Sequence, residues 1–100
     1  MNASILLITG WGGGTQLLEP LQHKLQQQGY IVELINIFNA FDAETLQHHV
    51  ELARRFDVII GWSLGGQLAT LLVQQLEQQF SEQKILISLA SNPCFVAQPN

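Results

Sequence analysis

The sequence is poor in charge, and especially in positive charge. Only 12% of the 100 residues are charged, and the formal net charge is −4. The four cations are Lys24, Arg54, Arg55 and Lys84. Since they form no stripe, we expect no binding to the backbone of a nucleic acid. At 47% hydrophobic residues, the chain has enough apolar side chains to form a core rather than stay disordered.

Cysteine, membrane-spanning runs and targeting signals are equally scarce. The single cysteine, Cys94, cannot form an intrachain disulfide, which favours a reducing compartment. The apolar run Ile5–Ile8 is too short to span a membrane. It also lacks the basic residues and the cleavage site of a signal peptide. These absences predict a cytoplasmic protein that does not contact a membrane, with residues 1–100 in a single domain.

Short apolar runs alternate with longer amphipathic stretches. Three of the four runs barely alternate in polarity, which is typical of strands covered on both faces of a parallel sheet. The stretches between them predict three helices. The first runs over Gln16–Gln28, with Thr15 as N-cap and Gly29 as the C-terminal stop; the second starts after Asp42 as N-cap; the third runs over Ser63–Phe80 and has a solvated, glutamine-rich face. The predicted strands are Ile5–Thr9, Ile31–Ile37, Phe56–Gly61 and Lys84–Leu89.

This alternation predicts an α/β fold with a parallel sheet between layers of helices. Right-handed crossovers favour the strand order 2-1-3-4, with four strands and three helices in three layers. Ligands bind such sheets at the carboxyl ends of the strands beside the point where the order reverses. Here that point lies between the first and third strands. Both strands lead into glycine-rich loops.

The loop after the third strand, Gly61–Gly66, matches the pattern G-x-S-x-G. In this pattern a serine occupies a strained turn between a strand and a helix, and the glycines remove side chains that would clash. The turn exposes the hydroxyl of Ser63 at a helix N-terminus, whose free N–H groups can stabilise negative charge. The alternative is that Ser63 only caps the helix.

The loop after the first strand, Gly10–Thr15, is even richer in glycine. Such a loop can bring backbone N–H groups close to a bound group. It could cradle a phosphate, but it matches neither the Walker pattern nor G-x-G-x-x-G. No acidic residue follows the second strand to bind a ribose. A nucleotide site is therefore disfavoured.

Together the segments Gly10–Gly12, Gly61–Gly66 and Leu89–Phe95 resemble the α/β-hydrolase serine esterases. They are especially similar to the pimeloyl-acyl-carrier-protein methyl ester esterases of biotin synthesis. The resemblance implies a partial α/β-hydrolase fold with Ser63 as nucleophile. It also implies that the N–H groups of Trp11 and Leu64 hold the oxyanion of a small acyl ester or an acyl-carrier-protein-linked substrate. It implies neither a cofactor nor a metal.

The sequence departs from this family in two places. Thr9 stands where the family usually has a histidine. That histidine supports the structure and is not the general base. The family's catalytic acid and histidine follow the serine on later strands, whereas no histidine follows Ser63 here. We expect the histidines to lie on helices away from Ser63, so that the triad is incomplete within these residues. They are His23, His48 and His49.

Two other functions remain open at this point. An acyltransferase or a thioesterase can use the same serine turn. Alternatively, the chain is a non-catalytic α/β remnant that associates with a partner or with itself. The fourth strand would end the sheet as an unpaired edge, and such edges favour association.

Overall fold

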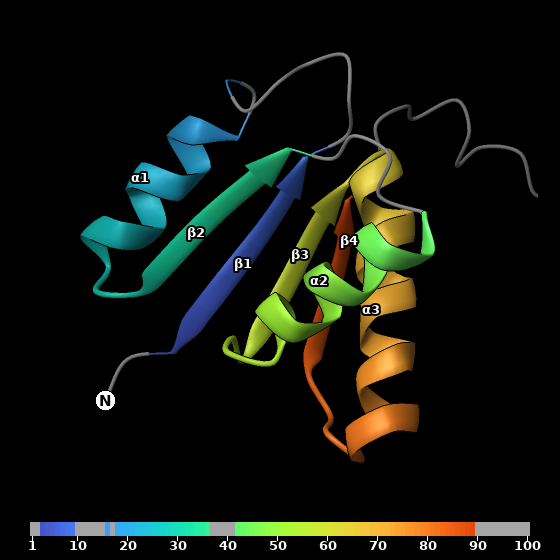
Figure 1. Cartoon of the computed structure of the whole chain (residues 1–100). Helices are drawn as coiled ribbons and strands as arrows, with labels where there is room; N and C mark the ends of the chain where they lie inside the picture. Colours follow the sequence, from blue (N-terminus) through green and yellow to red (C-terminus); the bar gives the residue numbers. More distant parts are fainter. Residues whose placement is uncertain (1–2, 10–15, 17, 37–41, 90–100) are drawn as a thin grey trace, which may run out of the picture.

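Four strands and three helices alternate along the chain in the computed structural model, which describes residues 3–9, 16, 18–36 and 42–89. The predicted βαβαβαβ order is confirmed (Figure 1). The elements are β1 (Ser4–Thr9), α1 (Glu19–Gln27), β2 (Ile31–Asn36), α2 (Ala43–Ala53), β3 (Val58–Trp62), α3 (Leu64–Phe80) and β4 (Ile85–Leu89).

The four strands form one parallel sheet in the order β2-β1-β3-β4, as the crossover rule predicted. β1 and β3 are neighbours at the point where the order reverses. At their carboxyl ends Thr9 lies opposite Trp62 on one side and opposite Asn36 on the other. The two glycine-rich loops therefore leave the sheet from adjacent positions.

Helices cover both faces of the sheet, which gives three layers. α2 and α3 pack on one face, where Leu6, Ile8 and Ile59 join Leu68 and Leu72 in one core cluster. α1 packs on the other face, over the side chains of a second, smaller cluster. In Figure 1, α2 crosses in front of the sheet and α3 runs beside β4, while α1 lies next to β2. The strands of the sheet therefore contribute to both cores.

The first helix begins later than the sequence predicted. It starts at Glu19 with Leu18 as N-cap, so the predicted cap at Thr15 and start at Gln16 are wrong. The reason is Pro20, which has no N–H and fits only the first turn of a helix. The predicted end at Gly29 is confirmed. Gly29 has φ 97°, and the N–H of Tyr30 donates to the carbonyl of Leu25, which completes a Schellman motif.

The other two helices follow their predictions closely. Asp42 caps α2 by accepting a hydrogen bond from the N–H of Thr45 at 3.3 Å. α3 buries Leu68, Leu72 and Leu76 completely. Its glutamine-rich face is largely exposed, as expected. Within the described part of the chain, none of the helices has the length and apolar composition to cross a bilayer.

One predicted strand boundary needs correction. β3 begins at Val58 rather than at Phe56, whose ring is instead buried in the core before the strand starts. β4 is the edge strand that the sequence predicted, and all of its residues from Ile85 to Leu89 are exposed. It lies at the edge of the sheet with α3 on one face only, whereas α1 covers the far end of the other face. Apolar composition alone does not distinguish such an edge strand from a buried one.

An ion-pair cluster ties the end of α2 to the segment between α3 and β4. Arg54 donates to Glu82 with 3.0 Å between Nη2 and Oε2, and its guanidinium lies 3.8 Å from the centre of the Phe80 ring. Lys84 Nζ lies 3.8 Å from the other oxygen of Glu82. The hydrogen bond from Arg54 lowers the pKa of Glu82 below its ordinary value of 4.5. Glu82 therefore stabilises the fold in its ionised form.

We expect the effect of Glu82→Gln on stability to depend on pH. A carboxyl whose folded pKa is lowered adds stability above its ordinary pKa and loses it as the pH falls through the folded value. The variant should unfold slightly more easily than the parent at pH 7, because this pair is exposed. The difference should vanish in acid below the lowered pKa. Urea unfolding at several pH values measures it, with Glu77→Gln as control. A difference that persists in acid would contradict the assignment.

Candidate active site

Ser63 stands between β3 and α3 at the carboxyl end of the sheet. Its backbone has φ 62° and ψ −125°, a conformation that residues other than glycine rarely adopt. The strain predicted for this turn is therefore observed. Although Ser63 occupies the N-cap position, its hydroxyl makes no capping hydrogen bond. The alternative that Ser63 serves only as a cap loses its main support, because the cap bond is not made.

The glycines around Ser63 permit the backbones of three elements to meet. A Cβ on Gly61 would collide with the backbone of Gly65 in the first turn of α3, and a Cβ on Gly65 would collide with the carbonyl of Ile8 in β1. A Cβ on Gly66 would collide with the Ser88 side chain of β4, while the nearest backbone atom, the carbonyl oxygen of Gly61, would be in ordinary contact at 3.4 Å. The pattern thus brings α3 into contact with three strands and fixes the direction in which the chain leaves β3.

The start of α3 is electrostatically suited to negative charge. The first N–H groups of a helix have no partner within the helix, and the helix dipole is positive there. Leu64 provides the first of these groups, directly after Ser63. No acidic residue lies in the first turn to neutralise the dipole. The start of α3, directly after Ser63, is therefore a favourable place for negative charge.

The second predicted oxyanion donor, Trp11, lies outside the described residues. The structure does describe Thr9, the last residue of β1 before this loop. Thr9 is fully buried at the end of β1 and lies opposite Trp62, which directly precedes Ser63. The convergence of the Trp11 and Leu64 amides, and the roles of Ser63, Trp11 and Leu64, stay predictions.

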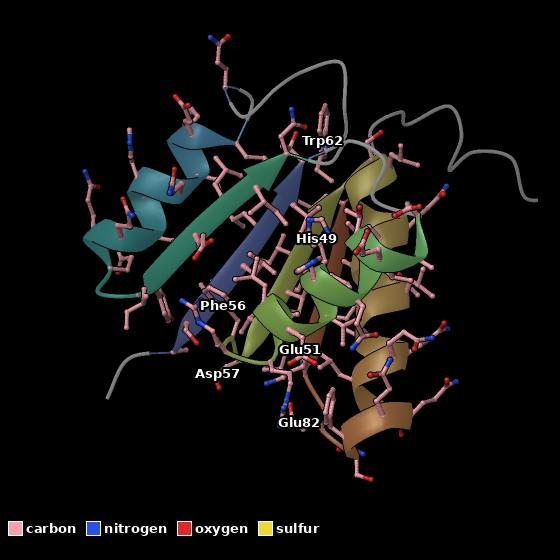
Figure 2. All side chains as sticks on the ribbon, in the orientation of Figure 1. His49, Glu51, Phe56, Asp57, Trp62 and Glu82 are labelled. Carbon is pink, nitrogen blue, oxygen red and sulfur yellow. The ribbon has the colours of Figure 1, made fainter. Side chains whose placement is uncertain are left out.

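The histidines lie on the helices where the sequence placed them. His23 belongs to α1, whereas His48 and His49 belong to α2. Nδ1 of His49 lies 2.9 Å from the carbonyl oxygen of Thr45 in the same helix. Figure 2 shows His49 on α2 beside the middle of the sheet, while Trp62 stands at the carboxyl end. Among the described residues, no group of three or more His, Cys, Asp or Glu could hold a metal ion.

Asp57 lies at the opposite end of β3 from Ser63 (Figure 2). Its carboxylate accepts a hydrogen bond from the N–H of Ser4 at 3.1 Å, and its own N–H donates to the Ser4 carbonyl. Asp57 therefore joins the start of β1 to the start of β3. Its position excludes contact with Ser63.

Two features at the carboxyl ends of the strands, around Ser63, were not predicted from the sequence. The N–H of Ser63 donates to the carbonyl oxygen of Leu89 at 2.9 Å, so the end of β4 supports the strained turn. At the end of β2, Oδ1 of Asn36 is buried and has no hydrogen-bond partner among the residues that the structure describes. Only the strand order and register reveal that these residues share an edge with Ser63, and neither residue type signals it.

Alanine substitutions at the two helical glycines should differ in cost. Gly65→Ala places a methyl group against the backbone of Ile8, which cannot rotate away, so it should destabilise the fold by about 1–3 kcal/mol. The matched control is Gly66→Ala, which meets the side chain of Ser88 and should cost less. Adding Ser88→Gly should recover the loss at Gly66 but not at Gly65. Thermal and urea unfolding of the variants measures the difference; equal costs would contradict the packing.

In comparisons with known proteins, no family and no solved structure matches the chain. Three curated proteins do. A biotin biosynthesis bifunctional protein (BioHC) of Saccharophagus degradans is 29% identical over 113 residues, which span 99% of this chain and 20% of that protein. The pimeloyl-[acyl-carrier protein] methyl ester esterase of Aliivibrio salmonicida is 31% identical, with 97% of this chain and 39% of the esterase aligned. The corresponding esterase of Aliivibrio fischeri is 29% identical, with 97% and 40% aligned.

The chain thus spans well under half the length of these relatives. Over nearly all of its own length it is similar to pimeloyl-[acyl-carrier protein] methyl ester esterases, which confirms the resemblance predicted from the segments Gly10–Gly12, Gly61–Gly66 and Leu89–Phe95.

Proposed function

We propose that the chain is the nucleophile-bearing part of a carboxylic ester hydrolase that works through an acyl-enzyme on Ser63. The observation that carries this proposal is the backbone of Ser63, with φ 62° between a buried strand and a helix N-terminus. Strain of this kind persists only where the surrounding packing enforces it, and it gathers at functional sites. The uncapped hydroxyl is consistent with this role.

The reaction follows from the groups around Ser63. Its Oγ bonds to the ester carbonyl carbon while its proton passes to a base, and the carbonyl oxygen becomes an oxyanion. The N–H of Leu64 and, by the resemblance, that of Trp11 stabilise this oxyanion. The C–O bond to the alkoxy group then breaks, and the alkoxy group leaves as an alcohol with the proton. Water next attacks the acyl group, which releases the acid and restores the Ser63 hydroxyl.

The base is the part of this mechanism that the described residues do not supply. Histidine and acid follow the serine in the α/β-hydrolase order, and the sequence has no histidine after Ser63. His49 bonds within α2, and Asp57 lies at the other end of the sheet. The proposal therefore requires an acid and a histidine from further polypeptide. The greater length of the relatives leaves room for it.

For the substrate we propose an acyl methyl ester carried on acyl carrier protein, in the cytoplasmic synthesis of biotin. Support comes from the names of the Aliivibrio relatives, which are esterases of pimeloyl-[acyl-carrier protein] methyl ester. The alignments cover nearly the whole chain, including the segment around Ser63. The proposal concerns the whole enzyme, since the chain aligns with 39–40% of these relatives.

The 100-residue chain alone should hydrolyse p-nitrophenyl butyrate barely above background, because a serine hydroxyl is a weak nucleophile without a base. Fusion to the part of the Aliivibrio salmonicida esterase that follows the aligned region should restore turnover. Ser63→Ala should then lower kcat by at least about 10³-fold. The matched control is Ser81→Gly, which alters an exposed serine with φ 56° and should keep activity.

Two results would contradict this proposal. If the fusion turns over ester equally well with Ser63→Ala, the nucleophile lies elsewhere. If the 100-residue chain alone is fully active and loses that activity on substitution of His23, His48 or His49, the base lies within these residues.

A further inference from the structure

Asn36, the last residue of β2, carries a buried polar atom that no described residue satisfies. Its Oδ1 is buried and has no hydrogen-bond donor within the described ranges. One other buried side-chain oxygen in those ranges lacks a hydrogen bond, Oε1 of Glu82, but the charged Nζ of Lys84 lies 3.8 Å from it. Burying an acceptor without a donor lowers stability, so such a group in a native protein calls for an explanation.

The sheet places Asn36 in one row with Thr9 and Trp62. Asn36 lies opposite Thr9 in the ladder of β2 with β1, and Thr9 lies opposite Trp62 in the ladder of β1 with β3. The three residues end their strands, whose arrowheads lie next to one another in Figure 1. Neighbouring strands are about 4.8 Å apart, so about 10 Å separates Asn36 from Trp62, the residue before Ser63.

The three side chains of this row point to the same face of the sheet, the face that carries α1. Side chains alternate between the two faces along a strand. In β2, Val32 and Leu34 belong to the core cluster under α1. Asn36 follows them at the same spacing and therefore points to the same face. Trp62 is a member of this cluster, and Thr9 follows the members in β1 by the same alternation.

The side chains beneath this row are apolar. Two residues before each member of the row, the strands place Leu34, Leu7 and Ile60 on the same face. Ligand pockets are mostly apolar as well, and a few polar groups in them fix the orientation of the ligand. In parallel sheets, ligands bind at the carboxyl ends of the strands beside the point where the strand order reverses. Asn36 has this position, and its Oδ1 accepts hydrogen bonds only.

From this placement we propose that Asn36 determines specificity for the substrate, because its Oδ1 accepts a hydrogen bond from an N–H or O–H group at the far end of the acyl group. The ester carbonyl binds at Ser63, and the acyl group extends along the row toward β2. A purely apolar acyl group leaves the oxygen unpaired, whereas an acyl group that ends in a donor pairs it. This inference rests on the proposed function of Ser63.

The effect of Asn36→Leu on stability tests whether the protein itself lacks the donor. Leucine has a similar size and no polar atom, so replacing an unpaired buried oxygen should raise the urea midpoint of unfolding. The rise should appear in the 100-residue chain and in the fusion to the Aliivibrio salmonicida segment, both without substrate. The control is Thr9→Val, which should lower the midpoint, because Thr9 is fully buried in the same row and has a partner. A fall with Asn36→Leu in either protein overturns the proposal, because the protein then supplies the donor.

A matched pair of substrates tests the specificity. One is the monomethyl ester of pimelic acid with an N-methyl amide at its other end. The second carries an N,N-dimethyl amide there, which has no N–H. The fusion should hydrolyse the first with the higher kcat/KM. Asn36→Leu should lower the ratio of the two kcat/KM values by at least about 10-fold, because it removes the acceptor. Asn36→Asp retains an acceptor oxygen and should keep the ratio in favour of the N–H substrate.

Failure of this inference and failure of the proposed function give different results. Suppose that the fusion shows turnover that Ser63→Ala abolishes, while Asn36→Leu leaves the ratio unchanged or lowers both kcat/KM values equally. The specificity role of Asn36 is then refuted, and the proposed function stands. If no turnover depends on Ser63, the proposed function fails, and the role of Asn36 falls with it.

Discussion

The close approach of α3 to β1 and β3 is the constraint on which the rest of this structure depends. Gly61 and Gly65 let the backbone of β3 and the first turn of α3 meet where any side chain would intrude. Gly65 also touches the backbone of Ile8 in β1. With the helix held at this distance, its leucines reach the central strands and form the larger core. The same approach forces the chain to turn sharply at Ser63.

The strain at Ser63 is therefore balanced by packing elsewhere in α3. A residue held in such a conformation costs about 1–3 kcal/mol. Burying one leucine side chain contributes about 1.5–3 kcal/mol, and α3 buries Leu68, Leu72 and Leu76 completely. The hydrogen bond from Ser63 N–H to Leu89 fixes the turn from the side of β4. A fold of this size can thus sustain one strained residue where chemistry requires an exposed hydroxyl.

Sequence patterns predicted the topology, the Asp42 cap and the Ser63 turn because each depends on local chemistry. Right-handed crossovers leave few possible strand orders, and a G-x-S-x-G pattern leaves few possible turns. The predicted start of α1 was wrong because it followed the spacing of the apolar residues and not the position of Pro20, which belongs in the first turn of a helix. The edge position of β4 followed from the predicted strand order, whereas the exposure of its side chains could not be predicted, since an apolar run is the same whether or not a helix covers it. The role of Leu89 depends on a register that no local pattern encodes, and the position of Trp11 stays a prediction.

The edge at β4 and the turn at Ser63 are mechanically connected, because the carbonyl of Leu89 accepts the hydrogen bond of the Ser63 N–H. β4 is joined to the sheet on one side only, through its ladder with β3. An edge strand frays more readily than a central one. Fraying at Leu89 would remove the acceptor for the N–H of Ser63 and loosen the strained turn. Any strand that pairs with the outer side of β4 therefore also holds Ser63 in place, because it fixes the strand whose carbonyl supports the turn.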